Sequence, residues 1–116
     1  MKENNGEERY CMDLNTEICM VIANAGESRS NSINAIECAK KGEYDKADEL
    51  YEKAEKAYYM GHRGHKEILV YSSQNEEDFQ LSYLLVHMSD ILLSAEIMLD
   101  MAKYIIFILK EVNKNA

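Results

Sequence analysis

The longest apolar segment, residues 79–110, constrains the fold more than any other stretch of the sequence. Its strongest stripe recurs with the period of an α-helix and comprises Leu81, Leu84, Leu85, Met88, Leu92, Ala95, Leu99, Ala102, Ile106 and Leu109. A second stripe lies about 100° around the same helix and comprises Tyr83, His87, Ile91, Ser94, Met98, Met101, Ile105 and Ile108. A helix that is apolar over most of its circumference must be covered on more than one side.

The rest of the chain also favours helix. It has no proline and only five glycines in 116 residues, enough for one domain with one core. Asp13 is a suitable N-cap for a first helix, and Lys40-Lys41-Gly42 forms a helix stop. A second helix is predicted over residues 44–71, and acidic residues 76–78 suit the start of a third that ends near residue 111.

These elements predict an all-α fold, an antiparallel up-down-up bundle of three helices over residues 13–116, preceded by a flexible tail over 1–12. The first helix has an unusually small and polar middle, residues 23–30, which predicts close approach of another helix. Its expected apolar side comprises Leu14, Ile18, Val21, Ile22, Ala25, Ile33 and Ile36. Gly61 and Gly64 weaken the second helix by about 1 kcal/mol each relative to alanine.

Charge and cysteine content exclude several classes of protein. The formal net charge of −8 argues against nucleic acid as a partner. The apolar run 102–109 is far too short to cross a bilayer, so no direct membrane insertion is expected. Cys11, Cys19 and Cys38 show no C-x-x-C spacing, which indicates free thiols in a reducing compartment. We therefore expect a cytoplasmic protein.

The second stripe of the third helix predicts self-association. A bundle of three helices covers one stripe per helix, so the second stripe would remain a large exposed apolar patch on a monomer. Symmetric packing of this helix against its own copies would bring Asp90 carboxylates together. Buried like charges are costly unless they share a cation or a proton.

The histidines are the candidate chemical groups. His87 shares a helix face with Asp90, and a neutral imidazole is nucleophilic near pH 7, although a structural histidine would fit the same position. His62 and His65 are three residues apart on the second helix and could join His87 in a three-histidine metal site. We favour the simpler interpretation that they are surface histidines beside Arg63 and Lys66.

Three motifs, in the right order and at the right spacing, carry a resemblance to a known family. Residues 25–30 read Ala-Gly-Glu-Ser-Arg-Ser, residues 42–47 read Gly-Glu-Tyr-Asp-Lys-Ala, and residues 84–90 read Leu-Leu-Val-His-Met-Ser-Asp. They resemble Ala-Gly-Asp-Ala-Arg-Ser, Gly-Asp-Phe-x-x-Ala and Leu-Leu-Val-His-Ala-Gln-Asp in the lactose/cellobiose type of enzyme IIA of the bacterial phosphoenolpyruvate-dependent sugar phosphotransferase system (PTS). The match extends over about residues 13–112.

The resemblance implies a homotrimeric phosphoryl carrier. The histidine matching His87 would accept a phosphoryl group from phospho-HPr and pass it to a cysteine of the cognate IIB component, for uptake of a lactose-, cellobiose- or chitobiose-like sugar. The aspartate matching Asp90 would gather with its symmetry copies around one Mg²⁺ ion at the trimer axis.

The sequence also departs from the family pattern. Ser89 stands where the family usually has glutamine, and Ile91 where it has a second histidine. The family's Ala-His-x-x-Gln-Thr is Gly-His-Arg-Gly-His-Lys over residues 61–66, which places His65 at the glutamine position. The alternative to a phosphoryl carrier is a degenerate IIA-like bundle that acts as a non-phosphorylated interaction protein or as a metal-binding protein.

Overall fold

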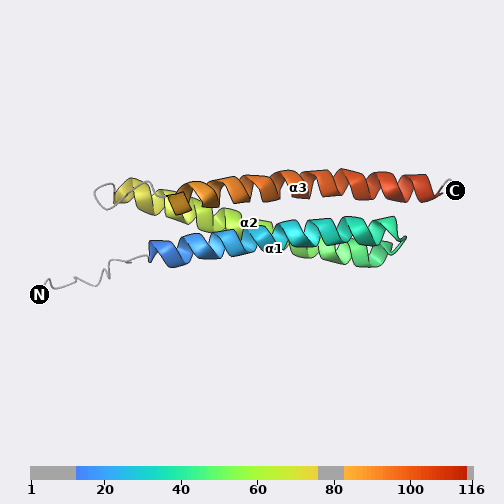
Figure 1. Ribbon diagram of the computed structural model, residues 1–116, viewed down its shortest axis with the longest axis horizontal. Helices are drawn as coiled ribbons and strands as arrows, with labels where there is room; N and C mark the ends of the chain where they lie inside the picture. Colours follow the sequence, from blue (N-terminus) through green and yellow to red (C-terminus); the bar gives the residue numbers. More distant parts are fainter. Residues whose placement is uncertain (1–12, 76–82, 115–116) are drawn as a thin grey trace, which may run out of the picture.

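The structure is a computed structural model that describes residues 13–75 and 83–114. Its elements are three helices, α1 (Leu14–Lys40), α2 (Tyr44–Gln74) and α3 (Tyr83–Lys114). Figure 1 shows that the chain runs along α1, returns along α2 and runs forward again along α3. The predicted all-α, up-down-up arrangement is confirmed for these residues. The expected tail at 1–12 and the acidic helix start at 76–78 lie outside the described residues.

The ends of α1 follow the predicted signals. Asp13 is the N-cap, and its carboxylate accepts hydrogen bonds from the Thr16 backbone N–H at 3.4 Å and from the Thr16 hydroxyl at 2.8 Å. At the other end Gly42 has a φ of +79°, in the left-handed region that glycine adopts at little cost. This turn reverses the chain into α2.

Helix α2 continues to Gln74, beyond its predicted end at residue 71. The serine and asparagine that suggest a loop satisfy the last backbone carbonyls instead. The Ser73 hydroxyl donates to the Val70 carbonyl at 2.8 Å, and the Asn75 amide donates to the Tyr71 carbonyl at 2.9 Å. Local side-chain hydrogen bonds therefore extend this helix by stabilising its terminus.

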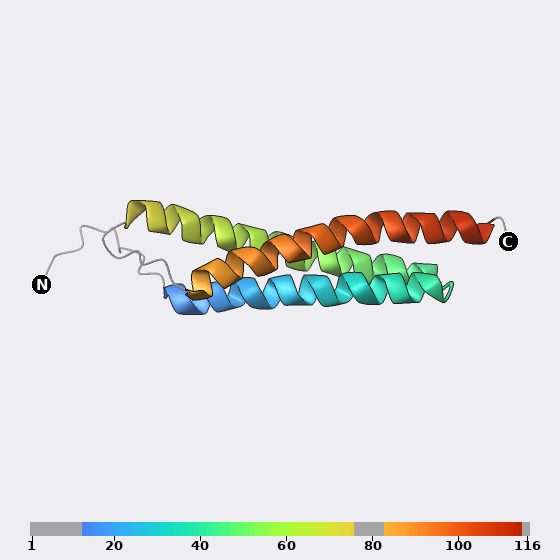
Figure 2. The ribbon, with the colours of Figure 1, turned by 45° about the horizontal axis from the view of Figure 1, so that its top comes forward.

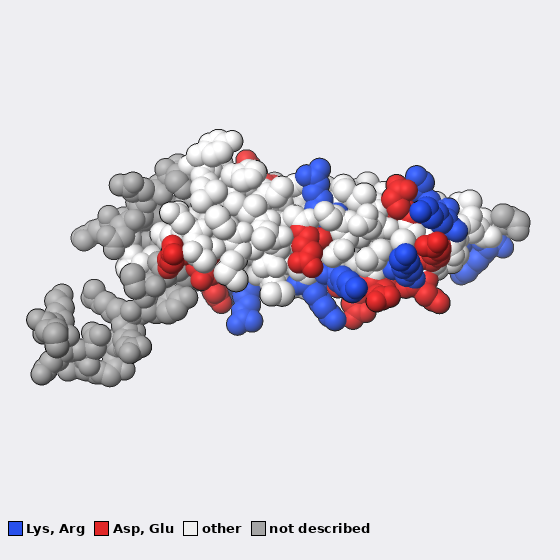
Figure 3. Space-filling view, turned by 60° about the horizontal axis from the view of Figure 1, so that its bottom comes forward, with Lys and Arg blue, Asp and Glu red and all other residues white. Residues whose placement is uncertain are grey.

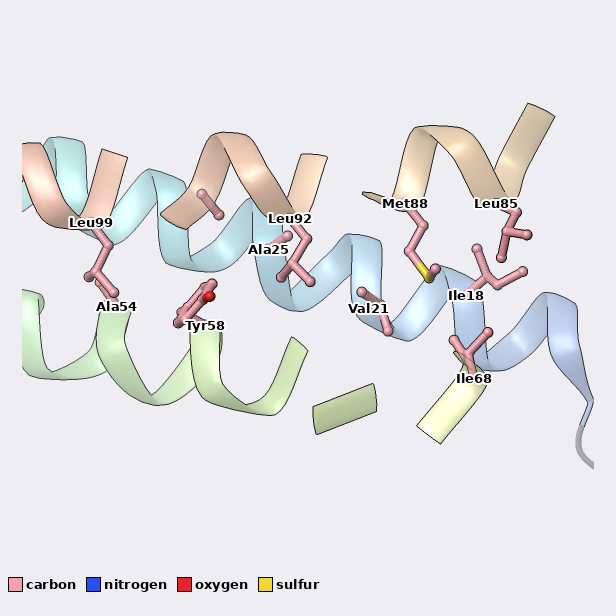
Figure 4. Close-up of a cluster of buried hydrophobic side chains, with 11 residues drawn as sticks. Ile18, Val21, Ala25, Ala54, Tyr58, Ile68, Leu85, Met88, Leu92 and Leu99 are labelled. Carbon is pink, nitrogen blue, oxygen red and sulfur yellow. The ribbon is translucent and has the colours of Figure 1, made fainter. Parts of the chain in front are cut away.

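One main core lies between the three helices, as the close-up in Figure 4 shows. Its buried members are Ile18, Val21, Ala25, Ala54, Tyr58, Ile68, Leu85, Met88, Leu92, Ala95 and Leu99. A second cluster, nearer the α1–α2 turn, contains Ala35, Cys38, Ala39, Ala47 and Ile106. The α3 residues of both clusters belong to the strongest predicted stripe, whose burial is confirmed for these residues. Leu84 and Leu109 of this stripe are half-buried, and Leu81 lies outside the described residues.

Close approach of α1 and α2 is also confirmed, although the responsible residues differ in part from the small ones that the sequence singles out. A Cβ atom on Gly64 would lie 2.9 Å from Val21 Cγ2, so no side chain fits there without movement. In the middle of α1, the fully buried Ser28 hydroxyl donates to the Ala54 carbonyl of α2 at 2.8 Å. A Cβ atom on Gly26, by contrast, would meet nothing within 4 Å.

The expected burial of Ile33 is wrong, because this side chain is 40% exposed on α1. Serine and alanine take its place in the core: Ser28, Ser32 and Ala35 are all buried on the side of α1 that faces the other helices. Small residues fit this narrow space, and a branched side chain would hold the helices apart.

Helix α3 keeps a second apolar surface, but this surface is not centred where the sequence predicts it. Figure 2 shows that α2 and α3 cross, so they cover only one side of each other, while α1 runs beside both. Ile91, Met98 and Ile105 of the predicted second stripe are half-buried on its flank. The exposed surface lies opposite the core, and we call it the outward face of α3: Tyr83, Val86, Leu93, Ile97, Met101, Tyr104, Phe107, Ile108 and Val112.

Within residues 13–75 and 83–114, no helix is long and apolar enough to cross a membrane. Of the three cysteines, Cys19 and Cys38 are free thiols, as predicted, and Cys11 lies outside the described residues.

Candidate functional site

His87 projects from the second turn of α3 while its neighbours anchor that turn. Leu85 and Met88 are buried in the main core, with Met88 fully inaccessible, so the backbone that carries the imidazole is fixed. The His87 side chain itself is exposed. Its ring lies parallel to that of Tyr83, with 6.4 Å between the ring centroids and 6° between the ring planes. An imidazole that is open to solvent on an anchored helical turn can receive a group from another protein.

Asp90 lies one turn after His87 and is also exposed. It follows Val86 by four positions and precedes Leu93 by three, so the three residues are neighbours on the helix surface. Val86 and Leu93 are 45% and 56% exposed, and both belong to the outward face. Asp90 is therefore a single carboxylate set among exposed apolar side chains.

The histidines of one chain do not converge. Within the part of the chain that the structure describes, no group of three His, Cys, Asp or Glu side chains could hold a metal ion. His62 lies beside Tyr58 on its own helix, with ring centroids 5.8 Å apart. The three-histidine site considered from the sequence is thus not formed within a single chain. A metal site at Asp90 would need carboxylates from further copies.

His65 reaches from α2 to the turn of α3 that bears His87. Its Nε2 atom lies 3.3 Å from the Ser89 hydroxyl oxygen, within hydrogen-bond distance. Burial of the ring lowers the pKa of His65, and the nearby His62 lowers it further, because both disfavour a positive charge. The His65 imidazole is therefore held in its neutral form near pH 7, next to the candidate site.

Sequence reasoning missed two partners in this region, Tyr83 beside His87 and Ser89 beside His65. The spacing of four residues could have indicated the first contact. The second joins positions 24 apart in sequence, so no local pattern predicts it. The only signal was that positions 65 and 89 both depart from glutamine in the family pattern.

The charges are unevenly distributed over the surface. In Figure 3, acidic and basic side chains crowd the end where α1 turns into α2, whereas the other half of that face carries fewer charges. Several of the charges pair with each other, as in the salt bridge between Lys110 Nζ and Asp48 Oδ1 at 2.7 Å. On the face that Figure 3 shows, the charged side chains are therefore concentrated toward the α1–α2 turn.

Comparison with known families gives a match over most of the chain. The family model described as "PTS system, Lactose/Cellobiose specific IIA subunit" matches residues 16–110. This range includes the candidate site and nearly all of the three helices.

Individual proteins agree with the family match. The chain is 29% identical to the lactose-specific EIIA component of Lacticaseibacillus casei over 89% of its own length and 95% of the relative's. It is 32% identical to the corresponding component of Streptococcus mutans, over 78% of this chain and 86% of that one. The crystal structure of the cellobiose-specific enzyme IIA from Bacillus anthracis superposes with a TM-score of 0.82 at 28% identity, covering 91% of this chain and 96% of the other.

Proposed function

Because this chain belongs to the lactose/cellobiose-specific IIA family of the sugar PTS, we propose that it carries a phosphoryl group on His87. The observation that carries the proposal is an exposed imidazole on a helical turn anchored by Leu85 and Met88. The donor would be phospho-HPr and the acceptor a cysteine of the cognate IIB component. The family and the names of its relatives favour a lactose-, cellobiose- or chitobiose-like sugar as the final recipient.

The chemistry needs few groups besides the imidazole. A neutral His87 nitrogen attacks the phosphorus of the donor's phosphohistidine, a new P–N bond forms, and the donor's P–N bond breaks to regenerate its imidazole. In the second transfer the IIB thiolate attacks the phosphorus, a P–S bond forms, and His87 is restored. Phosphoryl transfer depends mainly on positioning and charge stabilisation. The fixed α3 turn and an apolar rim suit such brief docking.

We also propose that the subunit assembles as a homotrimer through the outward face of α3. Ile97 and Leu93 are each 56% exposed there, and a row of such side chains along a whole helix is unusual on a monomer. Around a threefold axis this face would bring three Asp90 carboxylates together. Carboxylate oxygens are ligands that suit Mg²⁺, so three Asp90 side chains fit one ion at the axis. The ion would offset two of their three negative charges and link the subunits.

A cytoplasmic location fits this role. Cys19 and Cys38 are free thiols, and persistent free thiols are typical of reducing compartments.

A reconstituted phosphorylation assay tests the carrier role. The chain is incubated with labelled phosphoenolpyruvate, enzyme I and HPr, and acid-labile phosphate on it is measured. We expect stoichiometric label on the wild type and none on His87→Gln. His62→Gln is the matched control, since it removes another exposed imidazole, and it should retain the label. Absence of label on the wild type would instead favour a non-phosphorylated interaction protein.

Sedimentation tests the assembly separately. Ile97→Glu should yield monomers, because it places a charge in the proposed interface. Met60→Glu is the control, since Met60 is 60% exposed on α2 and lies outside the outward face. A monomeric wild type would refute the trimer without affecting the assay on His87.

A further inference from the structure

The contact between His65 and Ser89 lies close to the proposed phosphoryl carrier without touching it. Ser89 follows His87 by two residues, which on an α-helix corresponds to a rotation of about 200° and a rise of about 3 Å. The two side chains are thus at nearly the same height on α3 but on opposite flanks. Asp90 and Val86 lie between these flanks, on the outward side of the helix. His65, bonded to Ser89 at 3.3 Å, sits on the flank away from His87 of its own chain.

Cyclic symmetry brings the two flanks together. In a closed ring of identical helices, each interface is heterologous, so one flank of a subunit meets the opposite flank of the next. If the outward faces of α3 surround an axis, the Ser89 flank of one subunit faces the His87 flank of its neighbour. Parallel helices related by such an axis keep equivalent residues at equal heights. The small rise between His87 and Ser89 therefore leaves the neighbour's His65 level with the carrier imidazole.

We propose that His65 completes the phosphoryl site in trans, as a hydrogen-bond donor to the phosphoryl group on His87 of the adjacent subunit; this rests on the proposed trimer and on His87 as the carrier. Ser89 engages Nε2 and so leaves Nδ1 of the ring available for a contact with the neighbour. Among the residues that the structure describes, no hydrogen bond involves Nδ1. When the Ser89 hydroxyl donates to Nε2, the proton of the neutral ring is on Nδ1, and Nδ1–H can donate to a phosphoryl oxygen.

His65 and Ser89 would thus act as a pair that replaces two amides. The family pattern that this chain resembles has glutamine at both positions, whereas the two residues found here hydrogen-bond each other. A histidine ring reaches across the interface where a serine alone would be too short. The proposal makes His65 a site residue specific to this chain, with the transferred phosphoryl group as its ligand.

Single variants give the first test. The rate of labelling of His87 by phospho-HPr should fall on the order of 10-fold to 100-fold in His65→Ala, as for loss of one hydrogen bond to a charged group. His65→Gln supplies an amide donor at the same place and should recover most of the rate. Unchanged labelling in His65→Ala, alongside a labelled wild type, would overturn the inference and leave the carrier role standing.

Mixed trimers then distinguish a partner in trans from a merely structural role. His65→Ala and His87→Gln subunits are unfolded together at equal amounts, refolded, and assayed for labelling. In trans, a His65→Ala subunit regains an intact site whenever its donor-side neighbour is a His87→Gln subunit, which random mixing provides in about half of the sites. We expect about half of the His87 sites to react at the wild-type rate. If all sites remain slow, the inference is overturned, because His65 then acts only within its own chain.

Discussion

Two serines on α1 provide a sharp test of how α1 and α2 pack. Ser28 and Ser32 lie one turn apart on α1, and both are 0% exposed. The Ser28 hydroxyl donates to the Ala54 carbonyl at 2.8 Å, whereas the Ser32 hydroxyl has no hydrogen-bond partner within the part of the chain that the structure describes. Replacing either residue with alanine removes the same oxygen from the same helix. The comparison therefore isolates the value of one interhelical hydrogen bond.

The expected magnitudes follow from the contacts. Ser28→Ala loses a hydrogen bond with a net value of about 0.5–1.5 kcal/mol. Ser32→Ala removes a buried, unpaired hydroxyl, which is worth about 1–3 kcal/mol in the opposite direction. Both variants gain the same few tenths of a kcal/mol in helix propensity, so that gain cancels in the comparison. We expect Ser32→Ala to be the more stable variant by about 1.5–4.5 kcal/mol.

Urea unfolding followed by circular dichroism measures this difference. With a slope of about 2 kcal/mol per molar urea, even the lower bound separates the two midpoints by about 0.75 M. Both variants are compared at one protein concentration, because any association of folded subunits adds to their apparent stability. Equal midpoints, or a lower midpoint for Ser32→Ala, would refute the reasoning. In that case the Ser32 hydroxyl must have a partner in the core, such as a buried water molecule.

Three further predictions concern other parts of the molecule. Gly64→Ala should destabilise the fold by about 1–2 kcal/mol, because the added Cβ would lie 2.9 Å from Val21 Cγ2. Gly26→Ala should instead stabilise α1 by about 0.5–1 kcal/mol, because nothing lies within 4 Å of its added Cβ. Urea unfolding of the two variants measures both changes. Because the pKa of His65 is lowered in the folded state, the unfolded chain binds a proton more readily than the folded chain. The contribution of His65 to the free energy of unfolding is therefore complete above about pH 6.5 and is lost as the pH falls through the folded-state pKa. His65→Gln should reduce this acid sensitivity in thermal melts. Asp90→Lys should dissociate the proposed trimer in sedimentation runs, and EDTA should lower the melting temperature of the wild type but not that of Asp90→Asn.

The sequence predicts the helices well because their signals are local. The Asp13 cap, the Gly42 turn and the buried stripe through Met88 each depend on residues within one or two turns of each other. The pattern of α3 also correctly indicates that more than one of its sides is apolar. Spacing within one helix, however, does not reveal where the neighbouring helices lie. For that reason the second stripe is predicted on a flank, while the structure exposes the side opposite the core.

The parts that could not be predicted depend on contacts between helices. Ile33 continues the apolar pattern of α1, but small residues take the buried positions because α2 comes so close. The two glycines of α2 look like weak points in its sequence, and only the packed structure shows that Gly64 has no room for a side chain against Val21. For the site, the motif identifies His87 and Asp90 as candidates, and their roles stay predictions, whereas the contact between His65 and Ser89 needs the fold.

The outward face of α3 makes the lifetime of this protein depend on its abundance. In the proposed trimer, each folded subunit is stabilised by mass action, and each tenfold rise in the concentration of free partner adds about 1.4 kcal/mol per bound partner. Scarce subunits would leave Leu93 and Ile97 open to proteases and to unrelated apolar surfaces. Abundant chain would therefore form a long-lived pool, and that pool would be cleared faster as its concentration declined.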